Sequence, residues 1–225
     1  MTTETSVMLE TPPQSKSRLP LVGIVALLVA AVLVVVFATR SGTPSDTSPE
    51  AGFARDMAVH HSQAVEMAFT IRDKTSDGPL RTLSYDIITT QTAQRGMFMG
   101  WLQEWGLDQA SSQPPMTWMA GHGHGGATPG VTPGAMPGMA SEADLNRLRA
   151  AQGKDAEVLF LQLMIRHHEG GVEMAQALLK LSDRPDVRSL AQHIVDSQTA
   201  EIKLMKDLLT QRGAQPLPSI LPTSP

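Results

Sequence analysis

Two His-His pairs are the residues of this chain best suited to chemistry, because a neutral imidazole can bind a metal ion or exchange a proton. The pairs are His60-His61 and His167-His168. A methionine stands three positions before and seven positions after the first histidine of each pair; these methionines are Met57, Met67, Met164 and Met174. The thioether is a soft ligand that suits Cu(I), and imidazole suits copper in either oxidation state. The spacing therefore indicates a copper site.

The two pairs belong to an internal repeat, in which His60 of the first copy aligns with His167 of the second. Aligned without a gap, residues 53–106 and 160–213 are identical at 16 of 54 positions, whereas chance would give roughly three. A repeat of this length predicts two copies of one supersecondary unit, here a helical hairpin. We therefore expect an all-α protein in which two repeated hairpins form a four-helix bundle.

Helical periodicity, at about 100° per residue, predicts which histidines point inward. His60 and His167 fall in the middle of an apolar face in their respective copies. His61 and His168 fall at the edge of that face, where they could bind a metal, cap a neighbour or face water. Glu66 and its counterpart Glu173 are expected in solvent.

Two interpretations of His60 and His167 remain open. Burying a neutral imidazole without a partner costs roughly a few kcal/mol, so a metal ion or a polar network must compensate. The inward faces of the second helix of each copy carry groups that could form such a network: Gln91, Gln94, Gln198 and Glu201. Glu201 could also be a metal ligand itself. The four methionines, taken alone, would be ordinary core residues.

Proline, glycine and capping residues delimit the expected helices. In the first copy, the predicted helices run from about Glu50 to before Gly78-Pro79 and from about Leu80 to Trp105. In the second copy, one helix ends at about Leu181, and after a break at Asp183-Arg184-Pro185 the other continues to Gln211, before Gly213. A capping-box pattern that begins at Ser141 predicts a further short helix.

The two hairpins are joined by residues 107–140, a long crossover rich in Gly, Pro, His and Met. So long a connection within a compact domain is typically functional or disordered. His122 and His124, flanked by methionines, have the composition of a second metal site. A flexible linker that happens to carry two histidines is the alternative.

The N-terminal part contains an uninterrupted stretch without a charge, residues 19–38. A helix of that length spans about 30 Å, the thickness of a bilayer core, and exceeds the usual apolar region of a signal peptide. We expect a bundle outside the cytoplasm, held by a single-pass anchor. The expected order is a disordered cytoplasmic tail (1–18), a transmembrane anchor (19–39), a linker (40–49), the bundle (50–213) and a disordered tail (214–225).

Composition excludes several functions. The formal net charge is −4, and no basic cluster with interleaved aromatic residues is present, so nucleic acid is not an expected partner. The chain has no cysteine, which excludes disulfides, thiolate metal sites and a cysteine nucleophile. No Glu-x-x-His motif of a ferritin-like di-iron site is present. A metal-dependent redox enzyme and a metal-free structural or interaction domain remain alternatives to a binding protein.

The repeated motif resembles the paired signatures of the domain-of-unknown-function family 305. The resemblance lies in Phe53-x3-Met57-x2-His60-His61-x3-Val65-x-Met67-Ala68, in its second copy from Phe160 to Ala175, and in Gln198-Thr-Ala-Glu201-Ile202 with Met205. It covers residues 50–213 and implies a ferritin-like four-helix bundle in secreted or membrane-anchored bacterial proteins, some linked to copper.

Two positions depart from a strict match between the copies or from the family. Gln94 stands where the second copy has Glu201, and Glu50 and Glu157 stand where we expect aspartate in at least the second copy. The two halves therefore need not bind a metal alike.

These observations predict a copper-binding protein of a bacterial cell membrane that prefers Cu(I) and has no catalytic residues. The candidate ligands are His60, His167, Met57, Met164, Met67, Met174, His61, His168, Glu201, His122 and His124. The oligomeric state does not follow from the sequence.

Overall fold

The computed structural model describes residues 23–32, 42–120 and 136–221. Within these ranges the chain forms helices, turns and loops and no strand. The chain divides into two units, Met1–Gly42 and Thr43–Pro225. The larger unit contains both repeats and is all-helical, as the sequence predicts.

In the smaller unit, residues 23–32 form a short helix. No helix within the described ranges is both long and apolar enough to cross a membrane. The predicted anchor over residues 19–39 is thus not confirmed, and residues 19–22 and 33–39 of it lie outside the described part of the chain.

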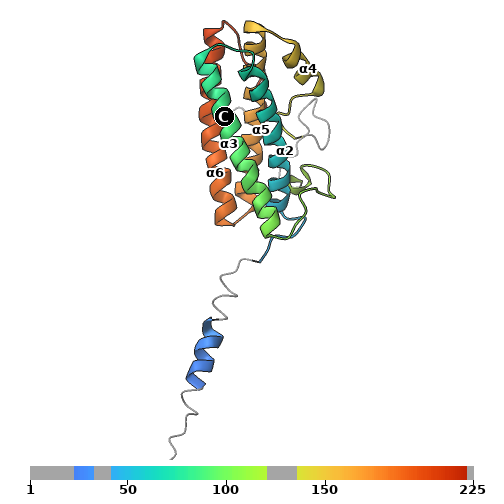
Figure 1. Ribbon diagram of the computed structural model, residues 1–225. Helices are drawn as coiled ribbons and strands as arrows, with labels where there is room; N and C mark the ends of the chain where they lie inside the picture. Colours follow the sequence, from blue (N-terminus) through green and yellow to red (C-terminus); the bar gives the residue numbers. More distant parts are fainter. Residues whose placement is uncertain (1–22, 33–41, 121–135, 222–225) are drawn as a thin grey trace, which may run out of the picture. The chain divides into compact units, whose positions relative to one another are not determined.

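Four long helices pack side by side in the larger unit (Figure 1). Helices α2 (Pro49–Arg72) and α3 (Gly78–Glu104) form the first hairpin, and α5 (Gly153–Leu181) and α6 (Pro185–Gln211) form the second. The short helices η1 (Thr117–Met119) and α4 (Glu142–Ala150) lie between the hairpins in the sequence. The predicted bundle and its boundaries agree with this arrangement to within a few residues.

Local sequence explains where these helices begin and end. Ser48 and Asp77 cap α2 and α3 by accepting hydrogen bonds from main-chain N–H groups of the first turn. Ser141 forms the predicted capping box of α4 with Asp144. Gly106 and Gly213 follow the ends of α3 and α6 with φ of 70° and 65°, a left-handed conformation that glycine adopts without strain.

Equivalent residues of the internal repeat form equivalent hydrogen bonds between the two hairpins. The Ser182 hydroxyl, after α5, donates to Glu50 at the start of α2 (2.6 Å). The Thr75 hydroxyl, after α2, donates to Glu157 at the start of α5. Each turn is therefore bonded to the other hairpin, and the two unexpected glutamates serve as these structural acceptors.

A second reciprocal pair shows that the halves have diverged. Arg212 forms an ion pair with Asp77 at 3.3 Å. The repeat has Trp105 at the position equivalent to Arg212 and Arg184 at the position equivalent to Asp77. The Arg184 guanidinium lies 5.6 Å from the centroid of the Trp105 ring. The same contact is thus an ion pair in one place and a cation–π contact in the other.

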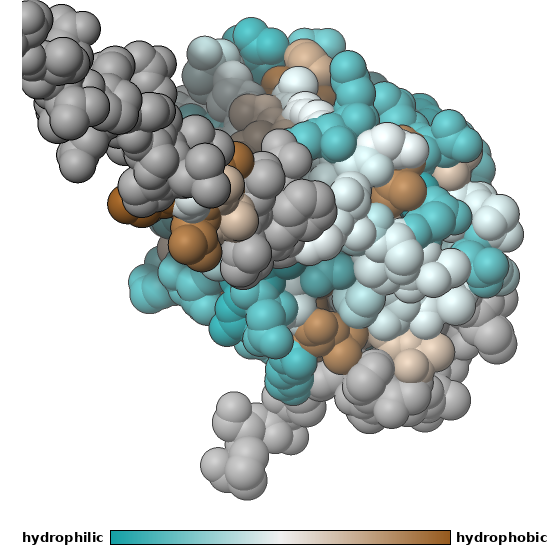
Figure 2. Space-filling model, turned by 90° about the horizontal axis from the view of Figure 1, so that it is seen from below, coloured by the Kyte–Doolittle hydropathy of each residue, from teal (hydrophilic) through white to brown (hydrophobic). Residues whose placement is uncertain are grey.

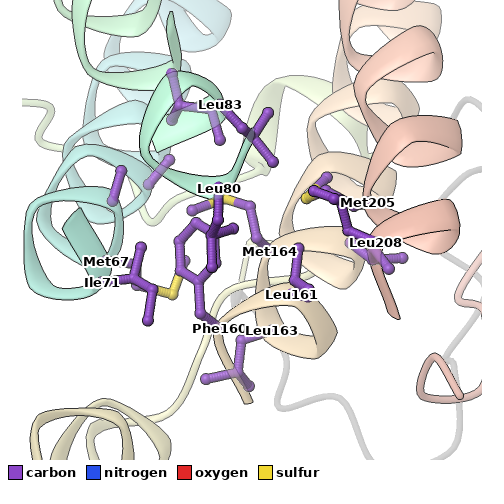
Figure 3. Packing of buried hydrophobic residues seen from close by; sticks show 14 of the residues in the cluster. Met67, Ile71, Leu80, Leu83, Phe160, Leu161, Leu163, Met164, Met205 and Leu208 are labelled. Atoms are coloured by element: carbon purple, nitrogen blue, oxygen red, sulfur yellow. The ribbon is translucent and has the colours of Figure 1, made fainter. Parts of the chain in front are cut away.

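Buried apolar residues form two clusters. One contains Met67, Phe160, Met164 and Met205 (Figure 3), and the other contains Phe53, Met57, Phe98 and Met174. On α2 and on α5, the His-His pair falls between residues of the first cluster and residues of the second. The histidines therefore form a polar layer between two apolar ones.

The described parts of the crossover pack against the bundle. Asp56 accepts hydrogen bonds from the Met116 main-chain N–H (2.7 Å) and from the Trp118 indole N–H (2.9 Å). Burial raises the pKa of Asp56, although these hydrogen bonds favour its charged form. Arg55, also buried, donates to the Asp108 carbonyl at 2.9 Å. His122 and His124 lie outside the described residues.

The C-terminal segment, for which a disordered tail is predicted over residues 214–225, forms hydrogen bonds with α5 in its described part. The Gln162 side chain donates to the Gln215 carbonyl at 2.7 Å. Buried Glu169 accepts hydrogen bonds from the Ser219 hydroxyl (2.8 Å) and the Ile220 N–H (3.0 Å). Pro216 and Pro218 disfavour regular structure here, yet side-chain and main-chain donors still fix the segment.

The outer surface of the bundle is mostly polar. The face shown in Figure 2 is largely hydrophilic with isolated hydrophobic residues. Val59, Phe69, Met97 and Leu204 are exposed hydrophobic side chains of the bundle, and they are scattered over three helices. Single exposed apolar residues are normal on water-facing surfaces.

Candidate metal centre

Four fully buried imidazoles meet at the middle of the bundle, and we call His60, His61, His167 and His168 the histidine cluster. His60 and His167 stack with ring centroids 3.7 Å apart and an interplanar angle of 33°. Each also neighbours the second histidine of its own pair, at 6.4 Å in α2 and 6.5 Å in α5. The predicted meeting of His60 with His167 is therefore present, and the histidines expected at the edge are buried as well.

The protonation of His60 follows from its partner. Its Nε2 lies 3.1 Å from the carbonyl oxygen of Pro137, and a carbonyl oxygen can only accept a hydrogen bond. The proton of the neutral ring is thus on Nε2, which donates to Pro137. The lone pair is on Nδ1, which is buried and has no hydrogen-bond partner among the residues that the structure describes.

The same arrangement recurs on the second helix of each hairpin. His61 donates from Nε2 to Gln94 Oε1 on α3 at 2.7 Å. His168 donates from Nε2 to Glu201 Oε2 on α6, also at 2.7 Å. Nδ1 of each ring is buried without a partner. Three imidazoles thus have an anchored N–H and an unpaired nitrogen.

His167 differs from the other three histidines. It lies close to the main chain of His60, but neither of its ring nitrogens has a partner with hydrogen-bond geometry. Leaving such a buried polar group unpaired costs roughly 1–3 kcal/mol. A metal ion bound by the unprotonated nitrogen of His167 would offset part of that cost.

Burial favours the neutral form of His60, His61 and His167. It lowers the pKa of His60 to about 4 and that of His61 to about 3, and the pKa of His167 lies well below its ordinary value for the same reason. The positive charge that each ring would carry repels the others and adds to this effect. At neutral pH these three imidazoles are in the form that binds metals.

Two buried glutamines, Gln91 and its counterpart Gln198, stand three residues before Gln94 and Glu201 on α3 and α6. Within the described ranges, neither the oxygen nor the nitrogen of either amide has a hydrogen-bond partner. Gly171 on α5 leaves the space that the Gln198 amide occupies, because a Cβ there would collide with its oxygen. Of the four predicted network residues, only Gln94 and Glu201 bond to histidines.

Residues 136–140, which we call the strap, cover the cluster between α2 and α5. The Gln63 side chain donates to the Ala140 carbonyl (3.0 Å) and accepts from the Ala140 N–H (2.8 Å). Gly138, with φ of 74°, lies directly on the α5 main chain. Gly170 is equally close to Pro137. These contacts hold the Pro137 carbonyl against His60.

The methionines are placed symmetrically about the cluster. Met57 and Met174 belong to one apolar cluster, and Met67 and Met164 to the other. All four are fully buried. One thioether from each hairpin is therefore present on each side of the histidines.

The donor set fits a soft, low-coordinate ion better than a hard one. No group of three or more His, Asp or Glu side chains within the described ranges is arranged to hold a metal ion. The unpaired nitrogens and the buried thioethers suit copper, and Cu(I) in particular. Because His60 and His167 stack face to face, an ion bound by both requires a rotation of at least one ring.

The sequence did not identify the strap as part of the site. Pro137 and Gln63 have no periodic pattern or metal-ligand chemistry that singles them out. The one available signal was Gly170-Gly171, a pair of glycines in a helix interior, which is costly unless another group approaches closely. Glu201, a predicted ligand, accepts a hydrogen bond from His168.

The model of the domain of unknown function DUF305 matches residues 50–209. The chain belongs to this family. Among solved structures, a DUF305 protein of Streptomyces coelicolor, described as a candidate secreted protein, is 48% identical with a TM-score of 0.70. The match covers 77% of this chain and 99% of that one. A DUF305 fragment from Deinococcus radiodurans is 32% identical with a TM-score of 0.59, over 72% and 96% of the two chains.

Structures of the protein CopM are also similar. Its Cu(I)-bound form is 25% identical with a TM-score of 0.55, and the match covers 73% of this chain and 96% of that one. Its Cu(II)-bound form is 26% identical with a TM-score of 0.54, over 73% and 97% of the two chains. The comparison with curated proteins gave no match.

Proposed function

We propose that this DUF305 protein binds copper at the histidine cluster and prefers Cu(I). The observation that carries the proposal is the hydrogen bonding of the imidazoles. His60, His61 and His168 donate from Nε2 to a fixed oxygen acceptor and leave Nδ1 unpaired. Metal-binding histidines characteristically donate their other N–H to a carboxylate or carbonyl group, which fixes the tautomer and the ring orientation.

The primary ligands in this proposal are His60 and His167, with one or more of Met57, Met67, Met164 and Met174. The lowered pKa values support it, because no proton has to leave these rings before a metal binds at neutral pH. The similarity to copper-bound CopM structures is consistent with the choice of metal. His61 and His168 are further ligands, and His122 with His124 form a second, looser site.

The proposal includes a location outside the cytoplasm, with residues 19–39 as a single-pass anchor in a bacterial cell membrane. Its support is the uncharged stretch over residues 19–38 and the similarity to a candidate secreted protein. Protease added to intact spheroplasts should degrade the bundle and leave cytoplasmic controls whole. Protection of the residues beyond 41 would refute this placement.

The metal proposal is tested by titrating the metal-free larger unit, residues 43–225, with Cu(I) against a coloured chelator under anaerobic conditions. We expect Cu(I) to bind more tightly than Zn²⁺, with no turnover of dioxygen. Iron with an oxygen-dependent near-ultraviolet band would instead identify a redox enzyme. A unit that retains no metal in any titration would identify a structural or interaction domain.

A further inference from the structure

The two hairpins present different charges to the histidine cluster. Gln94 and Glu201 are equivalent residues of the repeat, and each accepts a hydrogen bond of 2.7 Å from Nε2 of the histidine opposite it. We call His61 and His168 the outer histidines, because each is the second histidine of its pair. The outer histidine of the first hairpin is therefore bonded to a neutral amide, and that of the second hairpin to a carboxylate.

This single difference changes how the imidazole behaves toward a metal. A hydrogen bond to a carboxylate is roughly twice as strong as one between neutral groups. It fixes the ring more firmly, and the negative charge makes the opposite nitrogen a better electron donor. Nδ1 of His168 is buried and has no hydrogen-bond partner among the described residues, so the increase in donor strength falls on a nitrogen that is not already bonded.

Solvent contact also distinguishes the two acceptors. The Glu201 side chain is 23% exposed, whereas Gln94 is buried. The carboxylate thus keeps part of its hydration while it bonds to a fully buried ring. This lowers the cost of placing a charge beside the cluster, since a fully buried carboxylate would lose all of its hydration.

We propose that Glu201 is a positioning residue that acts through His168 and makes the second half of the cluster bind copper more strongly than the first. The inference rests on the proposed function and assigns Glu201 a role behind the ligand, rather than on the metal. His168 becomes the dominant outer ligand, and His61, backed by Gln94, contributes less.

The test exchanges the two acceptors in the full chain. Glu201→Gln keeps the shape and the hydrogen bond but removes the charge, and the double variant Gln94→Glu/Glu201→Gln moves the charge to the first half. Asp207→Asn is the matched control, because it removes one negative charge from the exposed side of the same helix. Cu(I) affinity is measured by chelator competition, and ¹⁵N NMR of the imidazoles identifies which nitrogens bind the metal.

Glu201→Gln should lower the Cu(I) affinity about 10- to 100-fold, while Asp207→Asn should change it less than about two-fold. Of His61 and His168, the one with the larger metal-induced ¹⁵N shift should be His168 in the parent and His61 in the double variant. In the metal-free protein, Glu201→Gln should already alter the His168 signals, and circular dichroism should show an unchanged helix content.

Equal Cu(I) affinity in the parent and in Glu201→Gln, with unchanged His168 signals, would overturn this inference and leave the proposed function intact. A direct Glu201–copper bond would be revealed by loss of copper without any change at His168 in the metal-free protein, and would also overturn it. If the parent binds no copper, the proposed function and this inference fall together.

Discussion

His60 and His167 occupy equivalent positions in the two halves and stack with their ring centroids 3.7 Å apart in a fully buried layer. A proton on either ring would place a charge against the face of the other ring with no water nearby. The pair is therefore stable only when both rings are neutral, or when a metal ion replaces the proton. The copper binding and the pH dependence of stability that we expect both follow from this packing of His60 against His167.

Replacing both histidines by glutamine should abolish copper binding at the cluster. In His60→Gln/His167→Gln, an amide of similar reach replaces each ring, so the bundle should stay folded better than with alanine. His193→Gln is the control, since His193 lies exposed on α6. Chelator competition and metal analysis measure the outcome. If the double variant binds as much Cu(I) as the parent, with the same affinity, the two histidines have a structural role only.

The metal-free bundle should lose stability as the pH falls from about 6.5 toward about 4. The folded pKa of His60 is about 4 against an ordinary value of 6.5, so in this window the unfolded chain binds more protons than the folded one. Stability then decreases by about 1.4 kcal/mol per pH unit for each such histidine. Below the folded pKa the loss levels off, because the folded state becomes protonated too.

Urea unfolding of the metal-free protein at pH 7.5, 6 and 5 measures this effect. Asp56, whose pKa is raised by burial, has the opposite effect on stability: near its own pKa it makes the folded protein more stable as the pH falls. The informative quantity is therefore the difference in slope between the parent and His60→Gln/His167→Gln. The variant should be less sensitive to acid. Identical slopes would show that these histidines are not held neutral in the folded protein.

Gly170→Ala should destabilise the bundle by about 1–3 kcal/mol. The added Cβ would collide with the Pro137 carbonyl, so the strap has to move away from α5 and from His60. Gly96→Ala is the matched control, because that glycine is exposed in the interior of α3 and nothing lies near its missing Cβ. It should gain about 0.5–1 kcal/mol from helix propensity. Thermal unfolding compares the two, and equal effects would contradict the close packing of the strap.

Substituting the crossover histidines should lower copper capacity without affecting the bundle site. His122→Gln/His124→Gln removes the imidazoles of the proposed looser site and leaves Trp118 and Pro137, which pack on the bundle, in place. Metal analysis at excess Cu(I) should give a lower ratio of copper to protein, whereas chelator competition should give an unchanged tight affinity. An unchanged ratio would remove these two residues from the proposal.

The fold could be predicted because the repeat and the helix-ending residues are local signals in the sequence. The burial of His61 and His168 could not, because periodicity places them at the edge of their helix face, and only the packing of α3 and α6 decides what covers that edge. The contacts of the strap could not be predicted for a related reason. Pro137 and Gly138 lie in a segment without periodicity, and their contacts are with residues distant in the sequence.

The reciprocal bonds from Ser182 to Glu50 and from Thr75 to Glu157 have an evolutionary consequence. Two separate copies of one hairpin with these bonds would assemble as a symmetric dimer, in which every substitution appears twice at the interface. Fusion into a single chain removes that restriction. One half of the molecule could then keep a neutral acceptor at position 94 while the other has a carboxylate at position 201, which a homodimer of hairpins could never achieve.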